Sequence, residues 1–361
     1  MHNVVNYGAT YQAYGLYKFL SDIPGVDVEF INYTMNDKKP EYKTVDKRES
    51  IIKRRIRQIK HFKRYFDIEN KKRKFYIFWD KKFICSENVY HGDAELLANV
   101  PCYDLFIAGS DQLFNLTLTN YSIGYFLPFK VKKISYSTSF GMNSLDKNNR
   151  SEVKKLLEDF KAVSVRELSA SAILKEELGV ENSVTADPVF LLEPEVWHSI
   201  SKTIRLPKKY ILCYIMSNNQ NLKACLDWIE SCEKMPIIIV KTCRDDIGIK
   251  GKQMNDLGPD EFLFVIENAS YVLTNSFHGC ALSIIFGKKI FCLEEERFKG
   301  DKRYEAMLAE AGITNCIVPY DTDWDKFNYE THLIDGFGAY ANMNDWVLKS
   351  KQYLLDNMNE P

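Results

Sequence analysis

Short apolar runs alternate with segments of helical periodicity along most of the chain. Runs rich in Val, Ile, Phe and Tyr are typical of buried strands, whereas apolar residues that recur every three or four positions predict amphipathic helices. The predicted strands are 27–32, 103–108, 133–137, 162–165, 183–186, 210–216, 236–240, 271–273 and 289–293. The predicted helices are 9–21, 50–79, 94–99, 150–160, 169–178, 221–230, 260–268, 280–286, 302–311 and 344–356. Such an alternation predicts parallel βα units.

These units fall into two groups, which predicts an α/β fold of two doubly wound, Rossmann-like domains with a crevice between them. At 361 residues the chain is longer than one hydrophobic core usually organises. Prolines bracket a short predicted helix that carries Trp197, and they place the domain boundary within 192–208. We expect an N-terminal domain over 1–195, a C-terminal domain over 205–335, and a final helix, 340–358, that packs back on the first domain.

Residues 38–82 form a strongly basic segment, with 18 Lys or Arg against six Asp or Glu, although the net charge of the chain is only −1. Apolar residues recur within it at helical spacing, as a basic amphipathic helix requires. Such a helix suits an anionic partner: lipid headgroups, a polyprenyl pyrophosphate, an acidic glycan or nucleic acid. A solvated helix with ordinary basic side chains is the alternative. Because no nucleic-acid-binding motif is present, we expect no specific nucleic acid partner and favour an anionic membrane surface.

The remaining sequence indicates a cytoplasmic protein, peripheral at the inner face of the membrane if segment 38–82 docks there. No run approaches the roughly 18 apolar residues that cross a bilayer, and the first twenty residues lack the apolar core of a secretory signal. The nine cysteines form no CxxC pair, and several lie in apolar runs. We therefore expect buried thiols in a reducing compartment.

Several familiar ligand motifs are missing from the sequence. It contains no GxxxxGK[ST] loop for a nucleoside triphosphate and no GxGxxG loop for a dinucleotide. Asp321-Thr322-Asp323 has the form of a metal-binding DxD, but it follows Pro319-Tyr320 late in the second half and is interpreted as a turn. We expect neither a metal nor a cofactor.

Residues 274–282, with the sequence TNSFHGCAL, form the most informative stretch. A short apolar run precedes it and an apolar segment that ends at Gly287 follows, so it predicts a strand, a polar turn and the start of a helix. Unpaired backbone N–H groups at a helix N-terminus attract phosphate or carboxylate. An imidazole beside them, here His278, can bind the same anion or move a proton near neutral pH. A capping or packed histidine without chemistry is the alternative.

Other polar turns follow predicted strands or open predicted helices in the same way. They lie at 6–9, 109–112, 137–141, 164–167 and 186–188. Each turn alone has a structural explanation, because glycine supplies positive φ and Ser or Asp caps helices. Because the carboxyl ends of parallel strands meet at one edge of a sheet, we expect these turns and His278 to face one crevice.

The sequences of these turns resemble those of the polysaccharide pyruvyl transferase family. The resemblance is carried in order by NVVNYGATYQAYGL at 3–16, YDLFIAGSDQLFN at 103–115, ISYSTSFG at 134–141, SVRE at 164–167, ADPVFLL at 186–192 and TNSFHGCALSIIFGKKIFCL at 274–293. It implies a GT-B-like fold, with the acceptor on the first domain and the donor on the second. It also implies exopolysaccharide biosynthesis: a pyruvyl ketal is transferred from phosphoenolpyruvate to a sugar of a surface polysaccharide or of its lipid-linked oligosaccharide precursor.

Roles for individual residues follow from the resemblance together with their chemistry. His278 and Asp111 are the expected catalytic residues, His278 for proton transfer or donor binding and Asp111 as the base or the acceptor of a sugar hydroxyl. Arg166 and Arg303 are expected to bind phosphate or carboxylate through bidentate guanidinium groups. The donor side is completed by Asn275, Ser276 and Gly279. The expected acceptor contacts are Asn6, Tyr7, Gly8, Gln112, Asn115 and Ser139.

One departure from the family leaves alternatives open. Characterised members commonly carry Arg-Leu-His at the histidine turn, so Ser276 stands where an arginine is usual. The candidates to replace that cation are Lys288, Lys289, Arg297, Lys299 and Arg303. A GT-B-type glycosyltransferase that uses a nucleotide sugar is the alternative function, and a non-catalytic scaffold of polysaccharide synthesis is the second alternative.

Overall fold

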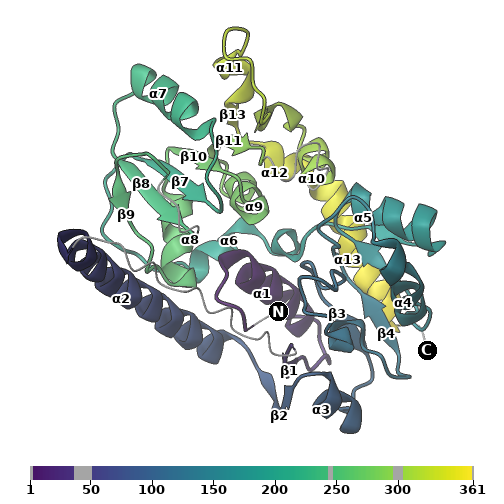
Figure 1. Ribbon diagram of the computed structural model, residues 1–361. Coiled ribbons are helices and arrows are strands. Elements are labelled where there is room, and N and C mark those ends of the chain that lie inside the picture. The colour runs from purple at the N-terminus through teal and green to yellow at the C-terminus, as the bar shows by residue number, and fades with distance from the viewer. Residues whose placement is uncertain (1–2, 36–50, 243–246, 296–303, 360–361) are drawn as a thin grey trace.

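The protein is described by a computed structural model that covers residues 3–35, 51–242, 247–295 and 304–359, with 51–64 described by their backbone alone. It has an α/β fold built from parallel sheets (Figure 1). Residues 211–335 form one sheet, and residues 106–184 contribute shorter parallel strands to the other half of the molecule. Arg297, Lys299 and Arg303, which the sequence suggested as anion ligands, lie outside the described residues.

The larger sheet has the strand order β12-β11-β10-β7-β8-β9 within the described residues. Its strands are β7 (Ile211–Ile215), β8 (Ile237–Lys241), β9 (Lys252–Gln253), β10 (Tyr271–Thr274), β11 (Lys289–Leu293) and β12 (Ile317–Val318), with β13 (Ile334–Asp335) antiparallel to β11. Its helices are α7 (Leu222–Cys232), α8 (Pro259–Glu267), α9 (Phe277–Ile285) and α10 (Glu305–Glu310). Every residue of β7 and β10 is buried. Strands covered on both faces read as continuous apolar runs, which is why the sequence predicted them closely.

The other half contains two short parallel strand pairs, β3 (Phe106–Ala108) with β4 (Lys133–Ser135) and β5 (Ser164–Val165) with β6 (Ser183–Val184). Single bridges from Ile134 to Ala162 and from Thr138 to Val165 connect the two pairs. The helices here are α3 (Asp93–Ala98), α4 (Lys147–Leu157) and α5 (Leu168–Ala172), which continues as a π-helix over Ile173–Leu178. The observed strands are shorter than the predicted ones. β4 ends at Ser135, and Ser137 turns the chain with a φ of 52°.

A further parallel pair joins β1 (Phe30–Thr34) to β2 (Cys85–His91). The sequence placed the first strand at 27–32 and missed β2, because Cys-Ser-Glu-Asn-Val-Tyr-His lacks a strand-like apolar pattern. The other unpredicted elements are short: α11 (Tyr329–His332), α12 (Ala339–Asn342), β9, β12, β13 and the 3₁₀ turns Ile123–Phe126, Pro188–Leu191 and Thr314–Cys316. The short helix with Trp197 is observed as α6 (Pro194–Ser199).

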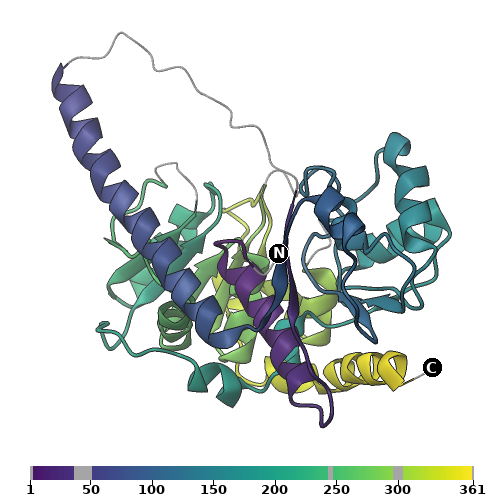
Figure 2. The same cartoon turned by 90° about the horizontal axis from the view of Figure 1, so that it is seen from below.

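The N-terminal helix α1 (Tyr7–Ser21) and the long helix α2 (Ile51–Lys82) share a hydrophobic cluster with α8 of the larger sheet. Tyr7 stacks on Phe262 of α8 with 4.2 Å between ring centroids, and α2 buries Phe75 and Trp79 in the same cluster. The aromatic face of α2 thus holds its C-terminal half against the body. The beginning of α2 projects away from the rest of the molecule (Figure 2).

The last helix, α13 (Asn344–Asn359), crosses to the half of the molecule that carries β3 to β6 (Figure 1). Its Ser350 hydroxyl accepts a hydrogen bond from the Ala186 N–H at 2.8 Å, and the Tyr353 hydroxyl donates to the Ser135 carbonyl at 3.0 Å. These bonds hold the strand ends that lead into the 137–141 and 186–188 turns.

Cysteine burial matches the expectation only in part. The buried thiols are Cys213, Cys225, Cys280, Cys292 and Cys316. Cys85, Cys102 and Cys232 are exposed, so the expectation of buried thiols is wrong for these three. Cys85 begins the missed strand β2, in which only Ser86 and Tyr90 are buried. Cys243 lies outside the described residues.

Candidate functional site

The TNSFHG turn, residues 274–279, connects β10 to α9 and includes the first residues of that helix. Ser276 caps α9, since its hydroxyl accepts a hydrogen bond from the Gly279 N–H at 3.3 Å. A Cβ on Gly279 would lie 2.5 Å from Thr274 Oγ1, so glycine alone fits at that position. The predicted strand, turn and helix are therefore observed, with α9 beginning at Phe277 rather than at Cys280. The cap and the Cys280 bond to the Ser276 carbonyl leave the Phe277 and His278 N–H groups without acceptors among the described residues.

The His278 imidazole lies between the N-termini of α9 and α1. A Cβ on Gly8, in the first turn of α1, would fall 2.2 Å from His278 Nδ1, so the ring packs directly on the bare backbone of Gly8. Asn6 caps α1 by accepting a hydrogen bond from the Ala9 N–H at 3.2 Å. Two helix N-termini, each with a partial positive charge, therefore converge on one imidazole. This arrangement favours a bound anion.

The other ring nitrogen of His278 faces Asp187. Nε2 lies 3.3 Å from Asp187 Oδ2, and His278 is 9% exposed. The contact is within ion-pair range, but its direction is poor, so Nε2 has no hydrogen-bond acceptor in line with it among the described residues. Asp187 itself caps the turn Pro188–Leu191 through the Val189 N–H. The carboxylate is thus fixed, and Nε2 of the imidazole beside it makes no hydrogen bond within the described residues.

Arg166 completes a buried ionic network around Asp187. Its Nη1 lies 3.1 Å from Asp187 Oδ2 and its Nε lies 3.3 Å from Glu167 Oε2, while its guanidinium stacks 4.4 Å from the Phe277 ring. Burial alone would raise the pKa of Asp187, but His278, Arg166 and the Val189 N–H together lower it to about 2. Burial disfavours the charged form of Arg166, yet Glu167, Asp187 and Asp111 shift its pKa upward. Both groups are therefore charged at neutral pH.

Asp111 and Ser139 approach the network from the ends of β3 and β4. Asp111 adopts a φ of 82°, a strained conformation that is uncommon outside glycine and is often found at functional sites. Its carboxylate is near enough to Arg166 to raise the pKa of the guanidinium. The Ser139 hydroxyl donates to Glu167 Oε1, and its oxygen also accepts from the Gly141 N–H at 2.9 Å. The structure therefore places Asp111, Ser139, Arg166 and His278 in one connected site.

Three other predicted site residues use their polar groups within the protein. The Asn275 Oδ1 accepts a hydrogen bond from the Met216 N–H at 2.8 Å, and its Nδ2 donates to the Ser217 carbonyl at 2.9 Å. The Tyr7 hydroxyl donates to the Leu257 carbonyl, and the Asn115 amide donates to the Phe140 carbonyl. These side chains brace the loops around the site. Gln112 is half-buried and lies close to Gly141, where a Cβ would be 2.2 Å from its Oε1.

Two candidates to replace the missing arginine lie at the wrong end of the sheet. Lys289 begins β11, and its Nζ lies 5.2 Å from the ring of Tyr271, which begins β10. Lys288 immediately precedes Lys289. Because β10 and β11 are parallel, this end is opposite to the Thr274 end that leads into the histidine turn. Neither lysine supplies a cation beside His278.

Sequence reasoning missed three charged residues around the site. Asp187 and Glu167 were recognised only as members of polar turns, because bonds to residues 91 and 28 positions away along the chain leave no local pattern. Lys71 of α2 lies with its Nζ 4.1 Å from the ring centroid of Tyr7, next to Gly8, and burial lowers its pKa to about 8. Nothing distinguishes Lys71 within the basic run Lys71-Lys72-Arg73-Lys74.

The described residues offer neither a metal-binding cluster nor a membrane-spanning helix. No group of three or more His, Cys, Asp or Glu side chains there could hold a metal ion. Asp323 of the DxD sequence pairs with Lys326 at 3.0 Å, in an exposed loop after β12. None of the helices in the described ranges combines the length and apolarity that a bilayer crossing requires.

The fold and the site define an α/β protein in which a histidine, a carboxylate and two helix N-termini converge. The chain belongs to the polysaccharide pyruvyl transferase family, whose model matches residues 6–297. Membership in this family implies a transferase. The match spans Gly8, Asp111, Arg166, Asp187 and His278.

Comparison with other known proteins adds distant structural similarity. No curated protein matches the chain. The S. aureus MnaA–UDP co-structure is similar with 12% identity and a TM-score of 0.48, covering 98% of this chain and 95% of that chain. UDP-GlcNAc 2-epimerase from Neisseria meningitidis bound to UDP-GlcNAc has 10% identity, a TM-score of 0.42 and coverage of 66% and 73%. UDP-GlcNAc 2-epimerase from Methanocaldococcus jannaschii has 15% identity, a TM-score of 0.40 and coverage of 72% and 79%.

Proposed function

We propose that the protein transfers a pyruvyl ketal from phosphoenolpyruvate to a sugar of a surface polysaccharide or of its lipid-linked precursor. The observation that carries the proposal is the position of His278, between two helix N-termini and 3.3 Å from Asp187. Phosphoenolpyruvate carries a phosphate and a carboxylate, so it needs two sites for negative charge. The unpaired N–H groups of α9 and the first turn of α1 are suited to bind one of these two charged groups, and Arg166 lies beside them.

The proposed reaction needs a proton donor close to the enol carbon. A protonated His278 donates its proton to C3 of phosphoenolpyruvate, and a sugar hydroxyl attacks C2. The C2–O bond to phosphate then breaks, and a second sugar hydroxyl closes the ketal at C2. Each of the two sugar hydroxyls loses one proton. One of these protons replaces the proton that His278 gave to C3, and the other is taken up by the released phosphate and the solvent. Because Asp187 stays ionised at neutral pH, it keeps a negative charge 3.3 Å from Nε2 of His278.

Asp111 is proposed to accept a proton from the attacking sugar hydroxyl. Its strained backbone projects the carboxylate at the end of β3, and its charge acts on Arg166. Arg166 in turn stabilises negative charge on the donor, although it is already paired with Asp187 and Glu167. We propose the half-buried Lys71, whose Nζ lies 4.1 Å from the ring centroid of Tyr7, as the second cation in place of the arginine that Ser276 replaces.

Release of inorganic phosphate tests this proposal. The full chain is incubated with phosphoenolpyruvate and a series of lipid-linked and free sugars, and phosphate is measured over time. We expect release with at least one acceptor, and a loss of about 100-fold or more in His278→Ala, as is usual for a general acid. His198→Ala is the matched control, because the His198 side chain is 74% exposed and pairs with Glu267 away from the site. An unchanged rate in His278→Ala would exclude the proposed role.

A further inference from the structure

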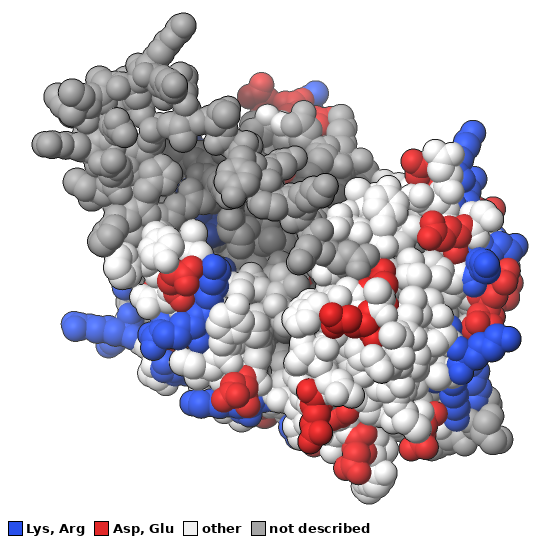
Figure 3. All heavy atoms as spheres, turned by 60° about the horizontal axis from the view of Figure 1, so that its bottom comes forward, with Lys and Arg blue, Asp and Glu red and all other residues white. Residues whose placement is uncertain are grey.

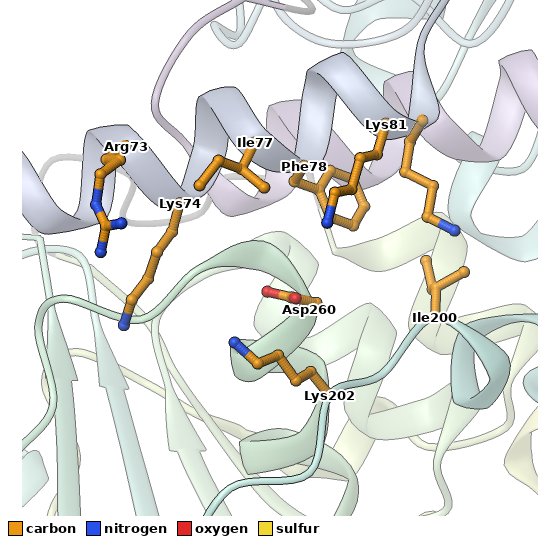
Figure 4. A pocket seen from close by; sticks show the side chains of 9 residues that line it. Arg73, Lys74, Ile77, Phe78, Lys81, Ile200, Lys202 and Asp260 are labelled. Atoms are coloured by element: carbon orange, nitrogen blue, oxygen red, sulfur yellow. The ribbon is translucent and has the colours of Figure 1, made fainter.

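A pocket lies away from the His278 site, between α2 and the beginning of α8 (Figure 4). It encloses about 210 Å³, which is enough for a phosphate group and part of a headgroup. Its charged lining residues are Arg73, Lys74, Lys81, Lys82, Lys202 and Asp260. Figure 4 shows Arg73, Lys74 and Lys81 reaching from α2 toward the segment that carries Lys202. The pocket is thus lined by five cationic side chains and one carboxylate.

Only part of this positive charge is neutralised by the protein itself. Lys74 and Lys202 both bind Glu261, at 2.7 and 3.1 Å, and Lys74 also lies 3.6 Å from Asp256. No carboxylate of the described residues pairs with Arg73, Lys81 or Lys82. Three cations at the rim of one small cavity repel one another unless an anion lies between them. The pocket is therefore suited to a phosphate-bearing ligand.

The same face of α2 exposes large apolar side chains. Phe66, Arg73 and Ile77 lie seven and four residues apart, so they share one face of the helix. Phe66 is 51% exposed and Ile77, which lines the pocket, is 43% exposed. Tyr76 on the neighbouring face is 57% exposed. Basic side chains interleaved with exposed apolar ones are typical of helices that lie at a lipid surface.

The position of α2 allows a flat surface to reach these side chains. The helix projects beyond the body of the molecule (Figure 2), and its sequence before Tyr65 remains basic, with seven Lys or Arg and no acid between 51 and 64. Figure 3 shows basic side chains at two opposite edges of this face of the molecule, one of them beside the atoms drawn in grey. A soluble phosphate would account for the pocket but not for the exposed Phe66 and Ile77.

We propose that the pocket and the exposed face of α2 dock the protein on an anionic lipid bilayer. Arg73, Lys81 and Lys82 hold the phosphodiester of a phospholipid headgroup, while Phe66 and Ile77 enter the interfacial layer. This inference goes beyond the proposed reaction and does not depend on it, because vesicle binding is measured without any donor or sugar.

Vesicle flotation of the full chain tests the proposal. Vesicles of phosphatidylcholine alone are compared with vesicles containing one third phosphatidylglycerol, and bound protein is measured at low and high NaCl. We expect binding to the anionic vesicles only, and release by salt because surface charges are screened. Lys81→Glu/Lys82→Glu should weaken partition at least about tenfold, since each basic residue near an anionic surface contributes roughly fivefold. Phe66→Ser should weaken it without changing the salt dependence.

Lys154→Glu/Lys155→Glu is the matched control. These two lysines are exposed, adjacent and in the last turn of α4, as Lys81 and Lys82 are in the last turn of α2. The proposal is overturned if both double variants lose binding equally, or if the wild-type chain ignores anionic vesicles. It is also overturned if pyrophosphate or duplex RNA binds through Lys81 and Lys82 while vesicles do not. Arg73→Glu provides an independent variant should the double variant fold poorly, as its thermal melt would reveal.

Discussion

At the scale of single residues, the site depends on the fit between Gly8 and the His278 ring. The three atoms nearest to a Cβ on Gly8 all belong to the imidazole, at 2.2 to 2.9 Å. A side chain at position 8 must therefore displace His278 from Asp187. Glycine in a helix costs up to about 1 kcal/mol relative to alanine, and this contact explains why that cost is tolerated.

A double-mutant cycle isolates this contact. Gly8→Ala should destabilise the protein by about 1–3 kcal/mol through overpacking and should lower phosphate release. In the His278→Ala background the same change should be neutral or stabilising, because the clash is gone and alanine favours the helix. Urea unfolding of the four proteins provides the measurement. Equal destabilisation in both backgrounds would show that Gly8 does not position His278.

Asp187 gives the protein a defined acid sensitivity. Its pKa is lowered to about 2 in the folded state from an unfolded value near 3.8, so its ionised form stabilises the fold above about pH 4. That contribution, on the order of 2 kcal/mol, is lost as the pH falls from about 4 to about 2. We expect the urea midpoint of the wild-type chain to fall over this range more steeply than that of Asp187→Asn. Parallel curves for the two proteins would contradict this account.

At the scale of elements, the β10–α9 turn is the part of the site that the sequence predicted best. A buried strand, a capping serine, a histidine and a glycine are all local features, and the observed turn contains each of them. β2 was missed because only Ser86 and Tyr90 are buried in it, so it lacks an apolar run. Asp187 was not predicted as the partner of His278, since folding brings together residues 91 positions apart. Long-range pairs of this kind leave no periodic signal.

The cap of α9 is predicted to matter for both stability and anion binding. Ser276→Ala removes the acceptor for the Gly279 N–H and should cost about 1 kcal/mol. It should also weaken phosphoenolpyruvate binding, because the helix N-terminus loses its fixed geometry. Ser276→Asn, which preserves an N-cap acceptor, is the matched control and should retain most of both. Urea unfolding measures the effect on stability, and calorimetric titration measures the effect on phosphoenolpyruvate binding. If Ser276→Ala and Ser276→Asn behave identically, the cap contributes to neither.

At the scale of the whole molecule, the C-terminal helix supports the site from the outside. Ser350 of α13 accepts the Ala186 N–H, one residue before Asp187, and it is 1% exposed. Ser350→Ala leaves that N–H buried without a partner and should lower the free energy of unfolding by about 1–3 kcal/mol. We also expect a lower rate of phosphate release, because the Asp187 turn shifts. Ser199→Ala, which removes an exposed hydroxyl in α6, should change neither quantity.

The central claim is that the convergence of α1, α9 and Asp187 on His278 forms the binding site for phosphoenolpyruvate. Thermal shift measures this most directly, because a ligand that binds the folded state raises the melting temperature. Phosphoenolpyruvate should raise the melting temperature of the wild-type chain and of His198→Ala but not that of His278→Ala. UDP-, GDP- and CMP-sugars should have no such effect. A shift with a nucleotide sugar that depends on His278, with none from phosphoenolpyruvate, would contradict the claim and indicate a glycosyltransferase instead.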